Sequence, residues 1–404
     1  MADTYVYKVR DKSGKIQQGE LEADSTMLVA NKLRQMGFVP IAIDKQKTSA
    51  TSKELHLFKP KAKLKDLAIF SRQFAVMIDS GLSLLRALSI LEEQTENKLL
   101  ATVLHEVRMD VEKGTSLSAA LARHPKVFNK LYVAMVRAGE TGGVLDSVLL
   151  QLADTIEKQV ELRQKVKSAM TYPVAVLCLV LLIVTAMLLF IVPTFKDLYA
   201  DLGGTLPVPT RILLAVSAIL KKWFPVVIAG QMGAVWLFKR WITTEKGRSA
   251  WDVFKLKVPV FGKLVHKTAL VRFSRTLSSL LRAGVPILES LDITSDTVGN
   301  TVMVKAVADV QEGVRAGESM AARLARHAIF PPMVVQMIAV GEETGAVDTM
   351  LDKIGEFYEQ EVEATVDALT SLLEPLLIVV MGTAVGGMVV ALYMPMFNII
   401  NLIK

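Results

Sequence analysis

The stretch that decides the fold is GETGGVLD at residues 139–146, because it returns as GEETGAVD at residues 341–348. Each version has a Gly-Glu pair, a later glycine, a branched residue and an aspartate. The two versions lie 202 positions apart in a chain of 404 residues. This spacing indicates an internal repeat that covers much of the chain.

The repeat extends well beyond this motif. Other matched pairs keep nearly the same spacing: FSR at 70–72 and 273–275, LARH at 121–124 and 324–327, Pro173 and Pro375, and Pro193 and Pro395. The first copy therefore runs from about residue 66 to 197, and the second from about 269 to 399. So many matches in one register exclude chance.

Long apolar runs set the class of protein. Hydrophobic residues make up 51% of the chain and the mean hydropathy is +0.39, which is high for a soluble protein. Residues 174–192 and 376–393 contain no charge, and each run can cross a hydrocarbon core of about 30 Å as a helix. We expect the prolines beside these runs, Pro173, Pro193, Pro375 and Pro395, to mark helix boundaries or kinks at the membrane edge.

A third, shorter apolar run at 224–238 has no counterpart in the repeat. Lysine and arginine side chains at both of its ends can reach outward to the membrane surface and extend it. A crossing here would return the chain, so that both repeats lie on one side of the membrane. Basic residues before the first run and after this one place that side in the cytoplasm.

The predicted fold class is mostly α: an integral membrane protein with two repeated cytoplasmic helical-bundle domains, three transmembrane helices and a small α+β N-terminal domain. The expected segments are the N-terminal domain 1–45, a linker 46–63, the first repeat 64–173, transmembrane helix 174–193, an extracytoplasmic loop 194–222, transmembrane helix 223–240, a connector 241–265, the second repeat 266–375, transmembrane helix 376–394 and an extracytoplasmic tail 395–404. The N-terminus would be cytoplasmic and the C-terminus extracytoplasmic.

Local signals predict individual helices. No glycine or proline interrupts 144–172, so one long helix is expected to run from the first repeat into the membrane. Gly81 and Gly284 are expected to end shorter helices, and Pro286 to lie near a helix start. At the N-terminus we expect a strand pair around Ser13-Gly14, followed by a helix capped by Ser25 and stopped at Gly37.

The repeated motif is predicted to be a corner between two helices. Gly139 would take the left-handed conformation that ends one helix, Glu140 would face the free amides of the next, and Gly143 would allow close backbone approach. The candidate residues are Gly139, Glu140, Gly143, Asp146, Gly341, Glu342, Gly345 and Asp348. They can form a purely structural corner, or an acidic corner that a partner contacts.

Small residues distinguish the last apolar run. Gly382, Gly386 and Gly387 form a face on which another helix can approach closely. Packing within the chain and self-association both fit this pattern.

Several kinds of chemistry lack their sequence signals. There is no phosphate-binding loop, the five histidines show no metal spacing, and the apolar runs contain no charged residue for an ion relay. The net charge of +7 suits lipid headgroups better than nucleic acid, because the basic residues flank the apolar runs. We therefore expect no catalytic residue, cofactor, metal or nucleic-acid partner. A transporter or a membrane enzyme subunit is the rival interpretation.

The sequence resembles the inner-membrane platform proteins of type IV pilus and type II secretion machines. The resemblance covers essentially the whole chain. Its most specific parts are the two corners, Tyr172-Pro173, Glu374-Pro375, VPTFKDLYADLGGTLPVPT at 192–210 and YMPMFN at 393–398. One departure is Gly142 in the first corner where the second has Thr344, which suggests different turn chemistry.

The resemblance implies two six-helix cytoplasmic domains, three spans, no catalysis and a role as the membrane core around which pilin polymerises. It also implies several partners: a separate hexameric cytoplasmic ATPase, pilin or pseudopilin subunits, other inner-membrane assembly proteins and further copies of the chain in a homo-oligomer. An N-terminal extension similar to YVYKVRDKSGKIQQGELEAD favours the pilus branch. A type II secretion platform is the alternative.

Overall fold

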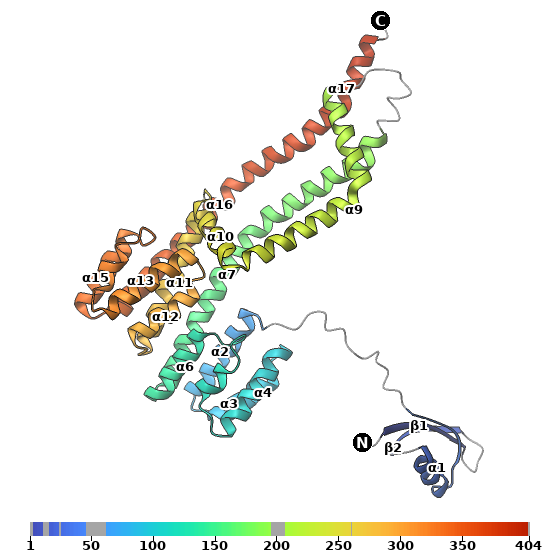
Figure 1. The fold of residues 1–404 in the computed structure, drawn as a ribbon, viewed down its shortest axis with the longest axis vertical. Coiled ribbons are helices and arrows are strands. Elements are labelled where there is room, and N and C mark those ends of the chain that lie inside the picture. Colours follow the sequence, from blue (N-terminus) through green and yellow to red (C-terminus); the bar gives the residue numbers. More distant parts are fainter. Residues whose placement is uncertain are drawn as a thin grey trace. The chain divides into compact units, whose positions relative to one another are not determined.

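The computed structural model describes residues 3–10, 16–23, 26–45, 62–194, 207–259 and 261–402. The chain divides into two compact units, 1–61 and 62–404. The described residues are mostly helical, and the strands lie in the first unit (Figure 1).

The first unit is a small α+β domain. Strand β1 (Asp3–Arg10) lies between β2 (Ile16–Ala23) and β3 (Val39–Lys45) in an antiparallel sheet, and helix α1 (Thr26–Gln35) packs against the sheet. Its core contains Tyr5, Val9, Val29 and Leu33. The expected strand pair and helix are present, and Gly37 follows the helix at φ +82°. The third strand was not expected, and Ser13, Gly14, Ser25 and residues 46–61 of the expected linker 46–63 lie outside the described residues.

Each repeat folds as six helices in the same order. The first contains α2 (Leu64–Asp79), α3 (Leu84–Gln94), α4 (Lys98–Glu112), α5 (Leu117–Ala122), α6 (Lys130–Gly142) and α7 (Leu145–Ala186). The second contains α11 (Phe261–Arg282), α12 (Ile287–Val298), α13 (Thr301–Arg315), α14 (Met320–Leu324), α15 (Pro332–Thr344) and α16 (Val347–Met381). Gly81 and Gly284 have φ of +82°, and Pro286 is the N-cap of α12, as expected.

Each sixth helix leaves its bundle as one continuous rod. The apolar face of α7 packs into the first core through Val148, Leu149 and Leu152, and its later residues are the uncharged run. A π-helical segment, η2 (Met187–Ile191), continues α7. In the second copy η3 (Gly382–Gly386) and α17 (Gly387–Leu402) continue α16. Helix α7 confirms the prediction of a long helix in the first copy, and α16 shows that the second copy has one as well.

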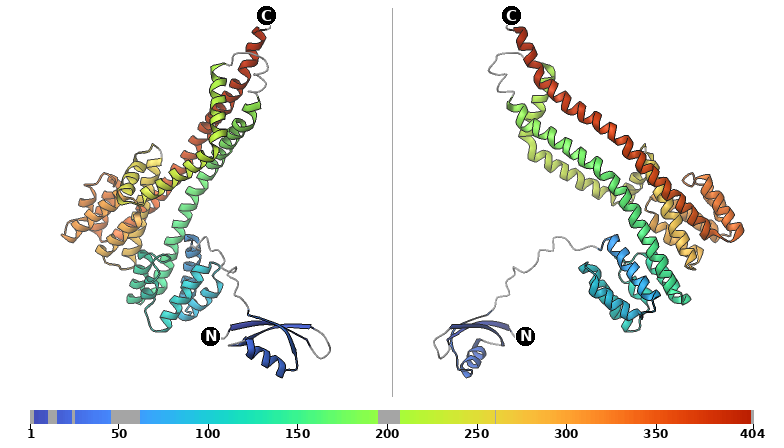
Figure 2. Two further views of the ribbon diagram at one scale, coloured as in Figure 1. Left: turned by 45° about the vertical axis from the view of Figure 1, so that its right-hand side comes forward. Right: turned by 180° about the vertical axis from the view of Figure 1, so that it is seen from behind.

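Two stretches of the described residues are apolar and long enough to cross a membrane, Leu145–Thr194 and Val347–Met394. The expected third crossing is not among them. It lies in α9 (Val208–Ile242), which begins well before residue 223, so 208–222 is helical where a loop was expected. Helix α10 (Glu245–Lys257) occupies the expected connector. Within unit 62–404, α7, α9 and α16–α17 all extend away from the two repeats (Figure 2).

The prolines do not end the long helices. Pro173 and Pro375 lie inside α7 and α16, and Pro395 lies inside α17, which continues to Leu402. Pro193 is also helical. Of the two expected roles, a helix boundary is wrong for Pro173, Pro375 and Pro395, and a kink at the membrane edge stays a prediction. Each long helix tolerates its proline because neighbouring turns still provide most of the backbone hydrogen bonds.

Candidate functional site

The repeated corner joins α6 to α7 and α15 to α16, but its glycines have exchanged the expected roles. Gly143 and Gly345, with φ of +68° and +72°, are the left-handed residues that end the helices. Gly139 and Gly341 are buried inside helices instead. The expectation that Gly139 ends its helix is wrong, because the left-handed position falls at the second glycine of the motif.

The buried glycines let two helices cross closely. A Cβ atom on Gly139 would lie 3.2 Å from the Cα of Leu145, and one on Gly341 would lie 2.9 Å from the Cα of Val347. Both neighbours are in the first turn of the following long helix. The first glycine of the motif therefore fixes how closely each long helix begins beside the preceding one.

The motif glutamates cap a different helix from the one expected. The Glu140 carboxylate accepts hydrogen bonds from the amides of Leu117 and Ser118, at 2.5 and 3.0 Å, at the start of α5. Glu342 accepts hydrogen bonds at the start of α14 from the amides of Met320 and Ala321, at 2.6 and 3.1 Å. A carboxylate is favoured there by the free amides and the helix dipole. Glu140 thus ties α6 to α5 rather than to α7.

The remaining corner residues lie near the surface. Asp146 is exposed in the first turn of α7, and the Asp348 carboxylate lies 3.6 Å from Arg282. Gly142 and Thr344 do not change the turn, since both corners use the same left-handed glycine. The corner is therefore a structural device in both copies. Contact with a partner remains a proposal.

Sequence reasoning missed a repeated ion pair on the two long helices. Arg72 of α2 pairs with Glu157 of α7 at 2.5 Å, and Arg275 of α11 pairs with Glu359 of α16 at 2.6 Å. Arg72 also pairs with Asp154, and Arg275 with Asp352. Hydrogen bonding to Arg72 lowers the pKa of Glu157. The repeated FSR motif could have indicated this ion pair, because it places an arginine at matched positions in both copies.

The two repeats also contact each other. The hydroxyls of Thr155 and Ser279 lie 2.9 Å apart, and Lys130 and Arg137 of the first repeat pair with Asp296 and Glu289 of the second. Leu280, Val285 and Ile293 of the second repeat belong to the first hydrophobic core. No sequence signal for this interface was recognised, because its residues lie on helix faces that the repeat pattern does not distinguish.

The small-residue face of the last apolar helix is open in a single chain. Gly382, Gly386 and Gly387 are exposed, and a Cβ atom added at any of them would meet nothing within 4 Å. These glycines lie in and directly after η3. Packing of this face inside the chain, one of the two expected possibilities, is not seen.

Comparisons with known proteins agree with this architecture. Residues 70–193 and 273–395 each match the family described as "Type II secretion system (T2SS), protein F", and residues 1–44 match its N-terminal domain. The chain is 44% identical over 399 residues to the type IV pilus assembly protein PilC of Thermus thermophilus, covering 98% of both chains.

Two other relatives are similar over nearly the whole chain. The type IV pilus assembly protein PilC of Myxococcus xanthus is 40% identical, covering 99% of this chain and 96% of its own. The type II secretion system protein F of Pseudomonas aeruginosa is 34% identical, covering 99% of both. With two matched repeats, a matched N-terminal domain and relatives of full length, the chain belongs to the type II secretion system protein F family.

Proposed function

We propose that this chain is the non-catalytic inner-membrane platform of a type IV pilus assembly machine. The observation that carries the proposal is the doubled architecture, in which each family domain continues directly into a long apolar helix. Such a rod joins a helical bundle to a membrane without a flexible joint. A movement imposed on either bundle would therefore be transmitted to its transmembrane helix.

The full topology is part of this proposal, with crossings at 174–193, 223–240 and 376–394. The first half of α9, before residue 223, contacts the other two apolar helices. The hydroxyl of Ser217 donates to the carbonyl of Leu188 at 2.6 Å, and that of Thr210 donates to the carbonyl of Ala391 at 2.5 Å. Both hydroxyls are buried, and α9 also packs against Leu188, Val192 and Leu392. Helix α9 thus binds the distal parts of both other apolar helices.

The proposed partners are a hexameric cytoplasmic assembly ATPase, pilin subunits, other inner-membrane assembly proteins and a second copy of the chain. The open face at Gly382, Gly386 and Gly387 is the proposed surface for the second copy. The exposed corner residues Asp146 and Thr141 are proposed as contacts for the cytoplasmic partners. The platform would couple ATP hydrolysis by the ATPase to pilin polymerisation.

A type II secretion platform is the second candidate, because a secretion relative is similar along the entire chain. The N-terminal domain does not separate the two functions, contrary to expectation. Its match is described as belonging to the type II secretion system protein, and the secretion relative covers it. The preference for pilus assembly now rests on the higher identities of the pilus relatives.

Purification of the full-length protein from crosslinked native membranes tests the proposal. A pilus platform should carry the major pilin and a second copy of the chain with it, and the amount of the second copy should fall when Gly386→Leu blocks the open face. Gly230→Leu, also exposed but on α9, is the matched control. Recovery of minor pseudopilins without major pilin would contradict the pilus proposal and favour a type II secretion platform.

A further inference from the structure

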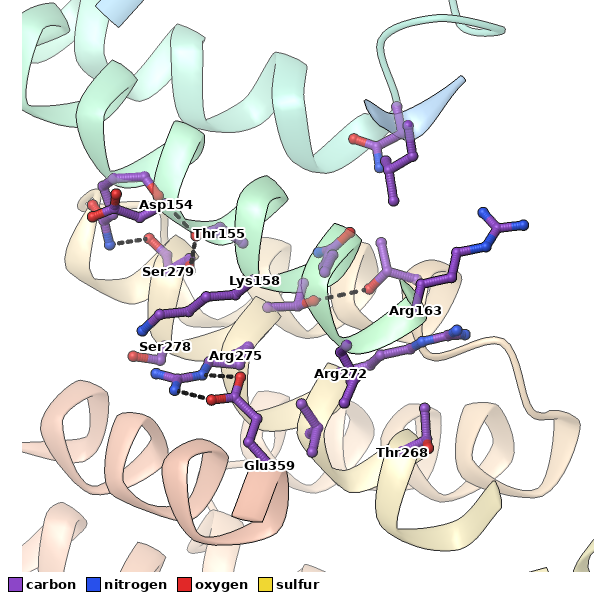
Figure 3. Close-up of a pocket in the computed structure, with 18 of the residues that line it drawn as sticks. Asp154, Thr155, Lys158, Arg163, Thr268, Arg272, Arg275, Ser278, Ser279 and Glu359 are labelled. Carbon is purple, nitrogen blue, oxygen red and sulfur yellow. Dashed lines mark hydrogen bonds and ion pairs between the residues drawn. The ribbon is translucent and has the colours of Figure 1, made fainter. Parts of the chain in front are cut away.

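A cavity of about 900 Å³ lies between the two repeats, alongside α7 (Figure 3). Its walls come mainly from α7 and α11. Neither the repeated corner nor the proposed transmembrane contacts use it. Its shape therefore needs an explanation of its own.

The charges that line this cavity do not balance. Seven basic side chains line it, against four carboxylates: Lys130, Lys158, Arg163, Lys167, Arg272, Arg275 and Arg282, and then Asp154, Asp296, Asp352 and Glu359. Each carboxylate is already paired, with Arg72, Lys130 or the pair Arg275 and Arg282. Among the described residues, no carboxylate pairs with Lys158, Arg163, Lys167 or Arg272.

Two of these unpaired cations lie next to each other. The side chains of Arg163 and Arg272, from α7 and α11, extend in the same direction (Figure 3). Desolvation by the surrounding protein, and after it the positive charge of Arg163, lower the pKa of Arg272. Both residues are exposed, so an anion can reach them, and two like charges side by side repel each other unless an anion lies between them. The Nη1 atom of Arg272 packs against Gly299 at the end of α12, 3.0 Å from where a Cβ atom on that glycine would lie. This contact accounts for the position of Arg272 but not for that of Arg163.

We propose that this cavity binds a phosphate-bearing anion through Arg163 and Arg272. Two guanidinium groups present paired N–H donors in the geometry that phosphate oxygens accept. The hydroxyl of Thr268 lines the same cavity and can donate a further hydrogen bond. Bound phosphate would join α7 to α11, and so set how the two repeats contact each other.

The phosphate can come from a lipid headgroup or from a soluble molecule such as a nucleotide. Leu162, Val166 and Met170 form an apolar wall along α7, on the way to the proposed membrane crossing, which suits a lipid. The volume is also large enough for a soluble phosphate ester. The lipid source rests on the proposed membrane location, whereas the soluble source does not.

The test uses the full-length protein in nanodiscs of phosphatidylcholine. Inorganic pyrophosphate is titrated calorimetrically as the soluble probe, and lipid retention from phosphatidylglycerol nanodiscs is measured by native mass spectrometry. The variants are Arg163→Gln and Arg272→Gln, with Arg315→Gln as control, because Arg315 is exposed on α13 and away from the cavity. Midpoints of thermal unfolding without ligand show that each variant folds.

Binding of either probe that weakens about tenfold in Arg163→Gln and Arg272→Gln, and is unchanged in Arg315→Gln, is the expected result. Pyrophosphate binding identifies a soluble ligand, and retained phosphatidylglycerol alone identifies a lipid. Without ligand, both cavity variants should unfold at a higher temperature than the wild type, since each removes a repulsion. Failure of both probes to bind, or equal losses in Arg315→Gln, would overturn the inference and leave the platform proposal intact.

Discussion

The two repeats hold the same arginine in different surroundings. The side chain of Arg72 is 35% exposed, whereas that of Arg275 is 9% exposed, although each pairs with the matched glutamate of its own long helix. Arg275 lines the cavity between the two repeats, where α11 also contacts α7 through Ser279, whereas Arg72 does not line that cavity. One motif therefore serves a surface in the first copy and an internal junction in the second.

The neighbouring serine shows the same divergence. The hydroxyl of Ser71 donates to the carbonyl of Leu67 at 2.7 Å and lies 3.2 Å from the hydroxyl of Tyr132. Ser274 is buried, and its hydroxyl has no hydrogen-bond partner. Val334 occupies the position that matches Tyr132, so the second core lacks that hydroxyl. Matched sequence preserves the helices, but the contacts depend on the residues across from them.

The largest expected effect comes from the buried arginine. Arg275→Ala leaves Asp352 and Glu359 without their shared cation, and should destabilise the second repeat by about 3 kcal/mol. Arg72→Ala removes a more exposed, solvent-screened pair and should cost about 1 kcal/mol. Native-state hydrogen exchange of amides in α16 and α7, in the full-length protein, measures each effect locally. Equal losses of stability in the two variants would show that the deeper burial of Arg275 does not strengthen its contribution.

The buried glycines should give the next largest effect, through crowding rather than backbone strain. Gly341→Ala places a carbon 2.9 Å from a backbone atom and should cost about 2 kcal/mol, and Gly139→Ala, at 3.2 Å, about 1 kcal/mol. Gly142→Ala is the control, because its added carbon meets only a side chain at 3.4 Å. Hydrogen exchange at the start of α16 and α7 reports the change. If Gly341→Ala leaves hydrogen exchange at the start of α16 unchanged, the two helices can move apart to accommodate the added carbon without cost.

The capping glutamates should follow, at about 1 kcal/mol each. Glu342→Ala removes bonds from the Ser319 hydroxyl and two amides, and Glu140→Ala removes bonds from two amides only. We expect faster exchange at the start of α14 than at the start of α5. Glu343→Ala, an exposed neighbour, should leave both helices unchanged. If it has the same effect, capping is not the cause.

The smallest expected effect is a pH dependence. Arg72 lowers the pKa of Glu157 from its ordinary value of 4.5, so the pair contributes stability above that pH and loses it as pH falls through the lowered pKa. The contribution should be below about 1 kcal/mol, because the pair is partly exposed. In Arg72→Ala, the hydrogen-exchange protection of α7 amides should therefore fall less steeply as the pH is lowered. An unchanged fall would mean that the pair contributes nothing to stability.

Periodicity and repeat matching predicted the helices, since both depend on local spacing. They could not assign Gly139 and Gly143 correctly, because either glycine can end a helix and only the packing of α6 on α7 decides between them. The same limit hid the pairing of Arg72 with Glu157, whose two residues are far apart in sequence. The charges beside the apolar runs predicted on which side of the membrane the repeats lie. They did not predict that α9 begins at Val208, because the helix continues through Lys221 and Lys222, where a loop was expected.

The central claim is that both repeats lie on the same side of the membrane. Single cysteines at the matched positions Thr141 and Glu343, and at Val208 near the start of α9, test it in a Cys178→Ala background. All three positions are exposed, unlike Ser217, which is buried against Leu188. In intact cells, with the outer membrane permeabilised, an impermeant thiol reagent should label Val208→Cys and leave Thr141→Cys and Glu343→Cys unlabelled. Labelling of Glu343→Cys but not Thr141→Cys would contradict the account, because the repeats would then lie on opposite sides.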